Sequence, residues 1–147
     1  HIGSIDHPDL GMLPLRTVAY VVVGPASFGE RLSRAGWKEV AETPWVAAPE
    51  RSHVARFLRM LFAQHGTRPN DVVECDQLSA MLDLVRSGLG MGLLREDVAL
   101  AAVEKGEVVI WPHGRIEGRL SLVYRLSAEH DPSIVGMLSV LREHWKI

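Results

Sequence analysis

The sequence has 147 residues, about the length of a single domain. Apolar residues make up 47% of it and charged residues 23%, with a net charge of −2, which excludes a disordered tail and a basic protein that recruits nucleic acid. A single cysteine excludes an intrachain disulfide, so a cytoplasmic location is the simplest expectation. No apolar run is long enough to cross a bilayer, and the opening residues do not resemble a signal peptide. Because the chain opens on His1, we expect further sequence upstream.

The first half of the chain predicts alternating strands and helices. A run rich in β-branched residues at 15–24 predicts a buried strand. Ser27 and Glu30 form a capping-box pattern for a short helix that ends at Gly36. The elements that follow are a strand at 44–49, a helix at 53–65 that ends at Gly66, and a strand at 72–75.

The second half continues the alternation. Asp76 is expected to cap a helix at 77–87, and Gly88 ends this helix before a strand over the segment LGMGLL. The remaining elements are a helix that begins at 95–97 and ends at Gly106, strands at 107–111 and 119–125, and a last helix with Asp131 as cap and Pro132 in its first turn. This order predicts an α/β fold, with a mainly parallel sheet covered by helices on both faces.

Two patterns invite a catalytic or nucleotide-binding interpretation, and each has a simpler structural one. Gly88, Gly90 and Gly92 follow a helix and enter a strand, which reverses the order in a dinucleotide-binding motif. We therefore assign them to a helix stop and a close approach of backbones. Glu74 and Asp76 could form a carboxylate pair, but no positioned nucleophile or base accompanies them.

Nucleophile and metal chemistry are not predicted either. Ser52 and His53 are adjacent without the strained turn that exposes a nucleophilic serine, so they are expected to open a helix. The seven histidines lack metal-ligand spacing, and Cys75 has no partner in a CxxC motif. We predict no catalytic residue, no metal and no cofactor.

Polar side chains follow two of the predicted strands. In an open α/β sheet, ligands bind beyond the carboxyl ends of the strands, where helix N-termini converge. The segments AAPERSH and ECDQLS are two such junctions, and Arg51 with Ser52 beside free helix N–H groups would form a cradle for an anion. The candidate effector-binding residues are Pro49, Glu50, Arg51, Ser52, Asp76, Gln77 and Ser79.

These motifs, in this order, resemble the effector-binding domain of LysR-type transcriptional regulators over essentially the whole chain. The resemblance is carried by the strand-P-E-R-S-helix segment, by FAQHGTRP and by ECDQLSAMLDLVRSGLGMGLL. Its most specific part is the V-x-x-G-x-G pattern that begins at Val85. LSLVYR followed by DPSIVGMLSVLREHW fits the closing strand and helix of the family. Arg95 departs from the proline that many relatives carry there.

The resemblance implies a type 2 periplasmic-binding-protein-like α/β fold, in which two subdomains joined by two crossing strands hold an effector. Residues 1–14 would be a remnant of subdomain I, and 15–124 would be subdomain II with crossover strands at 15–24 and 119–125. Residues 125–147 would form the C-terminal helix that returns to subdomain I. The chain would then hold one complete subdomain and the C-terminal part of the other, with the DNA-binding domain upstream.

The function implied is effector binding in a transcription regulator whose DNA binding and oligomer arrangement change with the effector. We expect a small organic acid, because of Arg51, Ser52 and the two helix N-termini. No direct contact of this fragment with nucleic acid or membrane is expected. An apolar helix face should favour a homodimer or homotetramer; it consists of Ile134, Met137, Leu138, Leu141 and Trp145. The alternatives are a solute-binding protein of a transport system and an enzyme on a related scaffold, and upstream sequence would distinguish the three.

Overall fold

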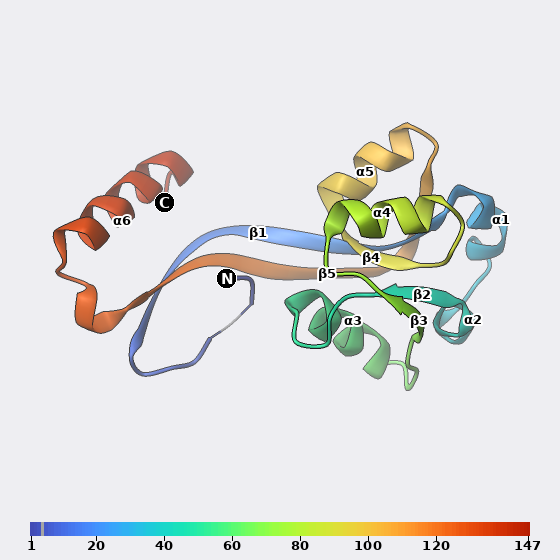
Figure 1. Cartoon of the computed structure of the whole chain (residues 1–147), viewed down its shortest axis with the longest axis horizontal. Coiled ribbons are helices and arrows are strands. Elements are labelled where there is room, and N and C mark those ends of the chain that lie inside the picture. Colours follow the sequence, from blue (N-terminus) through green and yellow to red (C-terminus); the bar gives the residue numbers. More distant parts are fainter. Residues whose placement is uncertain (4) are drawn as a thin grey trace. The chain divides into compact units, whose positions relative to one another are not determined.

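The computed structural model of the chain describes residues 1–3 and 5–147, which form two compact units. One unit is Ala19–Ile116, and the other combines His1–Val18 with Glu117–Ile147. Both units contain parts of two long strands, β1 (Leu10–Pro25) and β5 (Val108–Arg125), which belong to a sheet of order β4-β1-β5 with β4 (Gly92–Arg95) (Figure 1). The two strands predicted at 107–111 and 119–125 are therefore one continuous strand, because the residues between them keep an extended backbone.

The strands of the Ala19–Ile116 unit pair in both directions. β2 (Pro44–Ala47) and β3 (Asn70–Glu74) are parallel, whereas β1 and β4 are antiparallel. A parallel bridge between Trp45 and Met91 connects β2 with the residues just before β4. The prediction of a mainly parallel sheet is thus wrong for β1. An alternation of strands and helices does not reveal a strand that runs against its neighbours, and mixed sheets of this kind are common.

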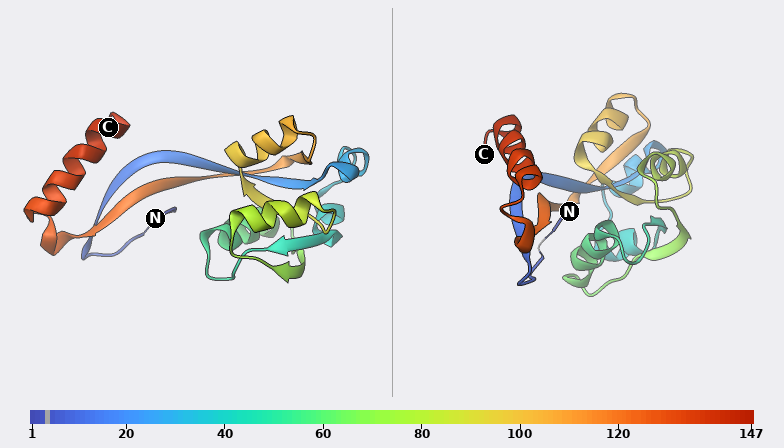
Figure 2. Two further views of the ribbon diagram at one scale, coloured as in Figure 1. Left: turned by 45° about the horizontal axis from the view of Figure 1, so that its top comes forward. Right: turned by 60° about the vertical axis from the view of Figure 1, so that its left-hand side comes forward.

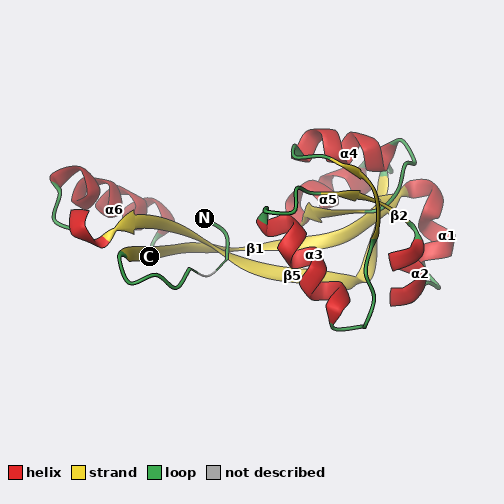
Figure 3. Ribbon diagram, turned by 60° about the horizontal axis from the view of Figure 1, so that its bottom comes forward, coloured by secondary structure: helices red, strands yellow, loops and turns green. Residues whose placement is uncertain are grey.

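Helices cover both faces of the β2–β3 sheet. The helical elements of this unit are η1 (Ala26–Phe28), α1 (Gly29–Leu32), α2 (Trp37–Glu42), α3 (His53–Ala63), α4 (Leu78–Arg86) and α5 (Glu96–Glu104). α3 lies on one side of β2 and β3, and α4 lies on the other (Figures 1 and 3). Successive side chains of a strand point to opposite faces. Accordingly Trp45 contacts Phe62 of α3, with ring centroids 5.3 Å apart, and Val46 packs in one cluster with Met81 of α4.

The two faces have different cores. The α4–α5 face is aliphatic and consists of Val21, Val23, Val46, Met81, Val85, Leu94, Ala99, Ala102 and Val108. The α3 face is aromatic, with Tyr20 on Phe57 at 5.6 Å and Trp37 on Phe62 at 5.2 Å between ring centroids. The buried Trp45 indole N–H donates to the carbonyl of Val40 at 2.9 Å, so this ring is buried without an unpaired donor.

The segment after β1 forms two short helices where one was predicted. The capping box at Ser27 and Glu30 is wrong, because Phe28 is the N-cap residue of α1 and no side chain caps it. The carboxylate contact occurs one helix later, where Oε2 of Glu39 accepts a hydrogen bond from the N–H of Gly36 at 2.9 Å. Gly36, predicted as a helix end, therefore precedes the first residue of α2.

Gly88 and Gly90 have the structural roles predicted for them. Gly88 has φ of 95°, which stops the helix in a left-handed conformation. A Cβ at Gly90 would lie 2.1 Å from the carbonyl oxygen of Pro44, so only glycine allows this approach. β4 begins at Gly92, later than predicted, because Met91 exchanges its backbone hydrogen bonds with β2.

The unit formed by His1–Val18 and Glu117–Ile147 contains η2 (Leu126–Ala128) and α6 (Pro132–Trp145) besides its parts of β1 and β5 (Figure 2). Asp131 caps α6 as predicted, since its Oδ1 accepts a hydrogen bond from the N–H of Ser133 at 2.8 Å. The Arg16 guanidinium lies 5.4 Å from the Trp145 ring, which places the end of α6 beside β1 within this unit.

The apolar face predicted for α6 is only partly buried within the chain. Leu138 is buried, and Ile134, Leu141 and Trp145 are half-buried. Met137 is the exception, with 40% of its surface exposed. Part of this face therefore stays accessible, and its role in a homodimer or homotetramer remains a prediction.

Candidate functional site

The two candidate loops leave the same edge of the β2–β3 sheet. β2 and β3 are parallel with Ala47 opposite Glu74, and the N–H of Cys75 donates to the carbonyl of Ala47 at 2.8 Å. Because the carboxyl ends of parallel strands meet at one edge, loops 48–52 and 75–77 begin side by side. The structure thus brings together the two groups of residues that the sequence analysis selected.

Loop 48–52 is a tight turn that starts α3. The N–H of Ser52 donates to the carbonyl of Pro49 at 2.8 Å, and the Ser52 hydroxyl oxygen accepts from the N–H of Ala55 at 3.1 Å. The Ser52 side chain is thus the N-cap of α3, although its O–H remains a donor. Arg51 is exposed, and its guanidinium makes no hydrogen bond or ion pair with any described residue. It is the free positive charge of this loop.

Loop 75–77 leads into α4, which has no side-chain cap. The prediction that Asp76 caps this helix is wrong, because Gln77 occupies the N-cap position and neither side chain accepts from the first turn. The side chains of Asp76, Gln77 and Ser79 are exposed and form no hydrogen bond with another described residue. The first N–H groups of α4 therefore lack a side-chain acceptor, and they carry the partial positive charge of a helix N-terminus.

A buried tyrosine–histidine pair lies at the start of α3, and the sequence analysis did not find it. The Tyr20 hydroxyl and Nε2 of His53 are 2.8 Å apart, and Tyr20 is only 5% exposed. Burial, together with the charge of Arg56, lowers the pKa of His53, while burial raises the pKa of Tyr20. Both shifts favour the neutral forms, so the pair is a hydrogen bond between a phenol and an imidazole, and its direction depends on the imidazole tautomer. These residues are 33 positions apart, so no local pattern could have indicated the contact.

The geometry offers no catalytic pair at this edge. The Ser52 hydroxyl caps α3, whereas the imidazole of His53 bonds with Tyr20, so the two neighbours do not form a nucleophile and base. No group of three or more His, Cys, Asp or Glu side chains able to hold a metal occurs among the residues that the structure describes. Arg95, whose position departs from the family pattern, is paired with Asp97 by two hydrogen bonds of 2.5 and 2.8 Å at the start of α5. What the edge provides is a polar recognition surface.

A family model described as the LysR substrate binding domain matches residues 1–146. The α/β architecture has the type 2 periplasmic-binding-protein-like fold, as predicted. The chain belongs to the LysR substrate-binding-domain family. It is an effector-binding domain of this regulatory family, and the prediction of a regulator is confirmed over that of a transport solute-binding protein.

Solved regulatory domains share this fold at low sequence identity. The CcmR regulatory domain from Synechocystis PCC6803, solved in complex with 2-PG, is 16% identical with a TM-score of 0.79, over 99% of this chain and 72% of that one. The effector binding domain of QuiR in complex with shikimate is 16% identical with a TM-score of 0.76, over 99% of this chain and 70% of that one. Full-length HypT from Salmonella typhimurium, a hypochlorite-specific LysR-type transcriptional regulator, is 12% identical with a TM-score of 0.76, over 99% of this chain and 51% of that one.

One further comparison found no match, and no helix among the described residues is a candidate membrane span. No curated protein sequence matches the chain. Within 1–3 and 5–147, none of the helices combines the length and the apolar character needed to span a membrane.

Proposed function

We propose that the loops at 48–52 and 75–77, with the first turn of α4, bind a small hydroxylated organic acid. The binding residues would be Pro49, Glu50, Arg51, Ser52, Asp76, Gln77 and Ser79. The observation that carries the proposal is the meeting of both loops at one sheet edge, where Arg51 is free and α4 is uncapped.

The positive groups of this edge favour a carboxylate or phosphate. Arg51 can form two parallel hydrogen bonds with a carboxylate, because its guanidinium has no other partner among the described residues. The first turn of α4 adds N–H donors without a side-chain acceptor. The Ser52 hydroxyl can donate while its oxygen caps α3.

The acidic groups of the same edge favour hydroxyl groups on the ligand. Glu50 and Asp76 are exposed carboxylates without a side-chain partner among the described residues, and a purely anionic ligand would be repelled by them. An ionised carboxylate is a strong acceptor for a hydroxyl donor. Gln77 and Ser79 add groups that both donate and accept. A molecule with one acidic group and several hydroxyls satisfies both sets, and the shikimate bound to the QuiR domain belongs to this class.

Effector binding would act on transcription through the parent protein. A ligand that binds one arrangement of the subdomains more tightly shifts the population toward it, and in a dimer or tetramer this changes the spacing of attached DNA-binding domains. We place 1–14 and 125–147 in subdomain I and 15–124 in subdomain II, in a cytoplasmic homo-oligomer. The role proposed for the chain is sensing, with no catalytic step and no cofactor.

Titration calorimetry with a panel of hydroxylated organic acids, beginning with shikimate, tests the proposal. For an acid that binds, Arg51→Ala should weaken binding by about tenfold or more, because a charge-assisted bidentate contact is lost. Arg34→Ala removes another exposed arginine from the same unit and should leave binding unchanged. Equal affinities of wild type and Arg51→Ala would remove Arg51 from the site.

A further inference from the structure

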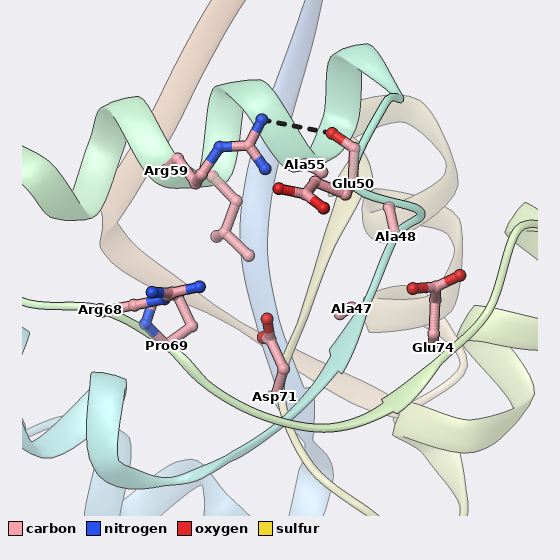
Figure 4. A pocket seen from close by; sticks show the side chains of 10 residues that line it. Ala47, Ala48, Glu50, Ala55, Arg59, Arg68, Pro69, Asp71 and Glu74 are labelled. Atoms are coloured by element: carbon pink, nitrogen blue, oxygen red, sulfur yellow. Dashed lines mark hydrogen bonds between the residues drawn. The ribbon is translucent and has the colours of Figure 1, made fainter.

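A pocket that shares Ala48 and Glu50 with loop 48–52 lies between α3 and β3. Its volume is about 230 Å³, and its apolar lining, here called its floor, consists of Ala47, Ala55 and Leu58. Figure 4 labels the first two of these residues. Charged side chains surround this floor: the carboxylates of Glu50, Asp71 and Glu74 and the guanidinium groups of Arg59 and Arg68. Three negative and two positive groups leave the lining with one net negative charge.

A β-bulge aims two of the carboxylates into this pocket. Trp45 of β2 is opposite Asp71, and Val46 is opposite Val73, so Val72 is an extra residue in β3. In a regular strand, side chains three positions apart point to opposite faces. The extra residue restores a common side for Asp71 and Glu74, and both carboxylates point to the α3 side of β3 (Figure 4). Bulges commonly re-aim side chains in this way beside functional sites.

Two carboxylates of the pocket have no hydrogen-bonded or ion-paired partner among the described residues. Asp71 and Glu74 make no side-chain hydrogen bond or ion pair with any described residue. Burial raises the pKa of Asp71, and the charge of Arg68 opposes this rise. One of the two arginines is already held, since Arg59 donates to the carbonyl oxygen of Glu50 at 3.2 Å. Both carboxylates are exposed to solvent and can accept a charge-assisted hydrogen bond from an ammonium group of a ligand.

We propose that this pocket binds a small diamino acid. Its carboxylate would pair with the guanidinium groups of Arg59 and Arg68, and its ammonium groups would pair with Asp71 and Glu74. The methylene chain between them would lie on the apolar floor. A ligand with two ammonium groups and one carboxylate carries one net positive charge, which complements the net charge of the lining. This inference does not depend on which molecule the loops 48–52 and 75–77 bind.

The probe for the pocket is L-lysine, titrated into the ¹⁵N-labelled chain and followed by amide chemical shifts. Saturable shifts are expected at Ala55, Leu58 and Asp71. Asp71→Asn and Glu74→Gln should each weaken binding by about tenfold, because each removes one charge-assisted contact. Glu104→Gln, which removes an exposed carboxylate at the end of α5, is the matched control and should bind L-lysine like the wild type. Circular dichroism melts show whether each variant is folded.

Two analogues separate the roles of the charges. Cadaverine lacks the carboxylate and glutarate lacks both ammonium groups, so each should bind at least about tenfold more weakly than L-lysine. No L-lysine shifts at the pocket up to the solubility limit would overturn the proposal. Unchanged affinity in both folded Asp71→Asn and Glu74→Gln, or equal affinity for L-lysine and cadaverine, would overturn it as well.

Discussion

At the scale of single residues, the hydrogen bond between Tyr20 and His53 makes stability depend on pH. The folded-state pKa of His53 lies below its usual 6.5 because burial and the charge of Arg56 disfavour the imidazolium. Between that lowered pKa and 6.5 the unfolded chain therefore binds more protons than the folded one. The stabilisation from His53 is present above pH 6.5 and is lost as the pH falls through the folded-state pKa.

His53→Gln tests this dependence, because an amide can donate or accept the hydrogen bond with Tyr20 and does not titrate. Urea unfolding of wild type and variant should show a steeper loss of stability in the wild type between about pH 7 and about pH 5. Other titrating groups contribute equally to both proteins. Parallel curves for the two proteins would show that His53 titrates normally in the folded chain.

At the scale of elements, the approach of Gly90 to β2 sets the connection between α4 and β4. A Cβ there would lie 2.1 Å from the backbone oxygen of Pro44, and that atom cannot move without disturbing the parallel strand pair. Gly90→Ala should lower the free energy of unfolding by about 1–3 kcal/mol or more, the usual range for overpacking. Denaturant titration measures the change.

Gly29→Ala is the matched control in the same unit. Gly29 has helical backbone angles, and a Cβ there would meet only Val109 at an ordinary 3.5 Å. Alanine should therefore be neutral or stabilise the chain by about 0.5–1 kcal/mol, because it lowers the entropy of the unfolded state. Equal destabilisation by both substitutions would mean that the close contact at Gly90 is not the cause.

The elements also show which patterns can be predicted from the sequence. Period and local stop signals identified α3 and the last helix. Asp131 is the predicted cap, and Ser52, which was expected to open α3, also caps it with its hydroxyl oxygen. Gly66 and Gly106 end helical segments with φ of 65° and 70°. These features depend on neighbours within a few positions. The prediction at Asp76 was wrong because a suitable cap residue must also occupy the N-cap position, which Gln77 takes.

Features set by contacts between distant segments could not be predicted. The antiparallel run of β1 against β4 depends on where the chain enters the unit, and the strand–helix alternation is the same for either direction. The bulge at Val72 requires the register against β2, and the pair of Tyr20 and His53 requires α3 to pack on β1. Topology alone, however, correctly placed loops 48–52 and 75–77 at one edge, since both follow parallel strands.

At the scale of the whole molecule, the proposed sensing surface is the edge of the β2–β3 sheet from which loops 48–52 and 75–77 leave. The Arg51 side chain and the uncapped start of α4 lie at this edge, and the pocket between α3 and β3 adjoins it through Ala48 and Glu50. The two ligand classes proposed for these places differ in charge. A hydroxylated organic acid should therefore perturb Arg51 and residues 76–79, whereas L-lysine should perturb Leu58 and Asp71, with Glu50 common to both places.

The most direct test is an amide-shift map of the ¹⁵N-labelled chain during titration with shikimate and related hydroxylated acids. The account predicts that at least one of these acids binds saturably, with its largest shifts at residues 49–52 and 76–79, and that Arg51→Ala weakens these shifts together. Shifts centred elsewhere in the chain, or no saturable binding by any acid in the panel, would contradict the account.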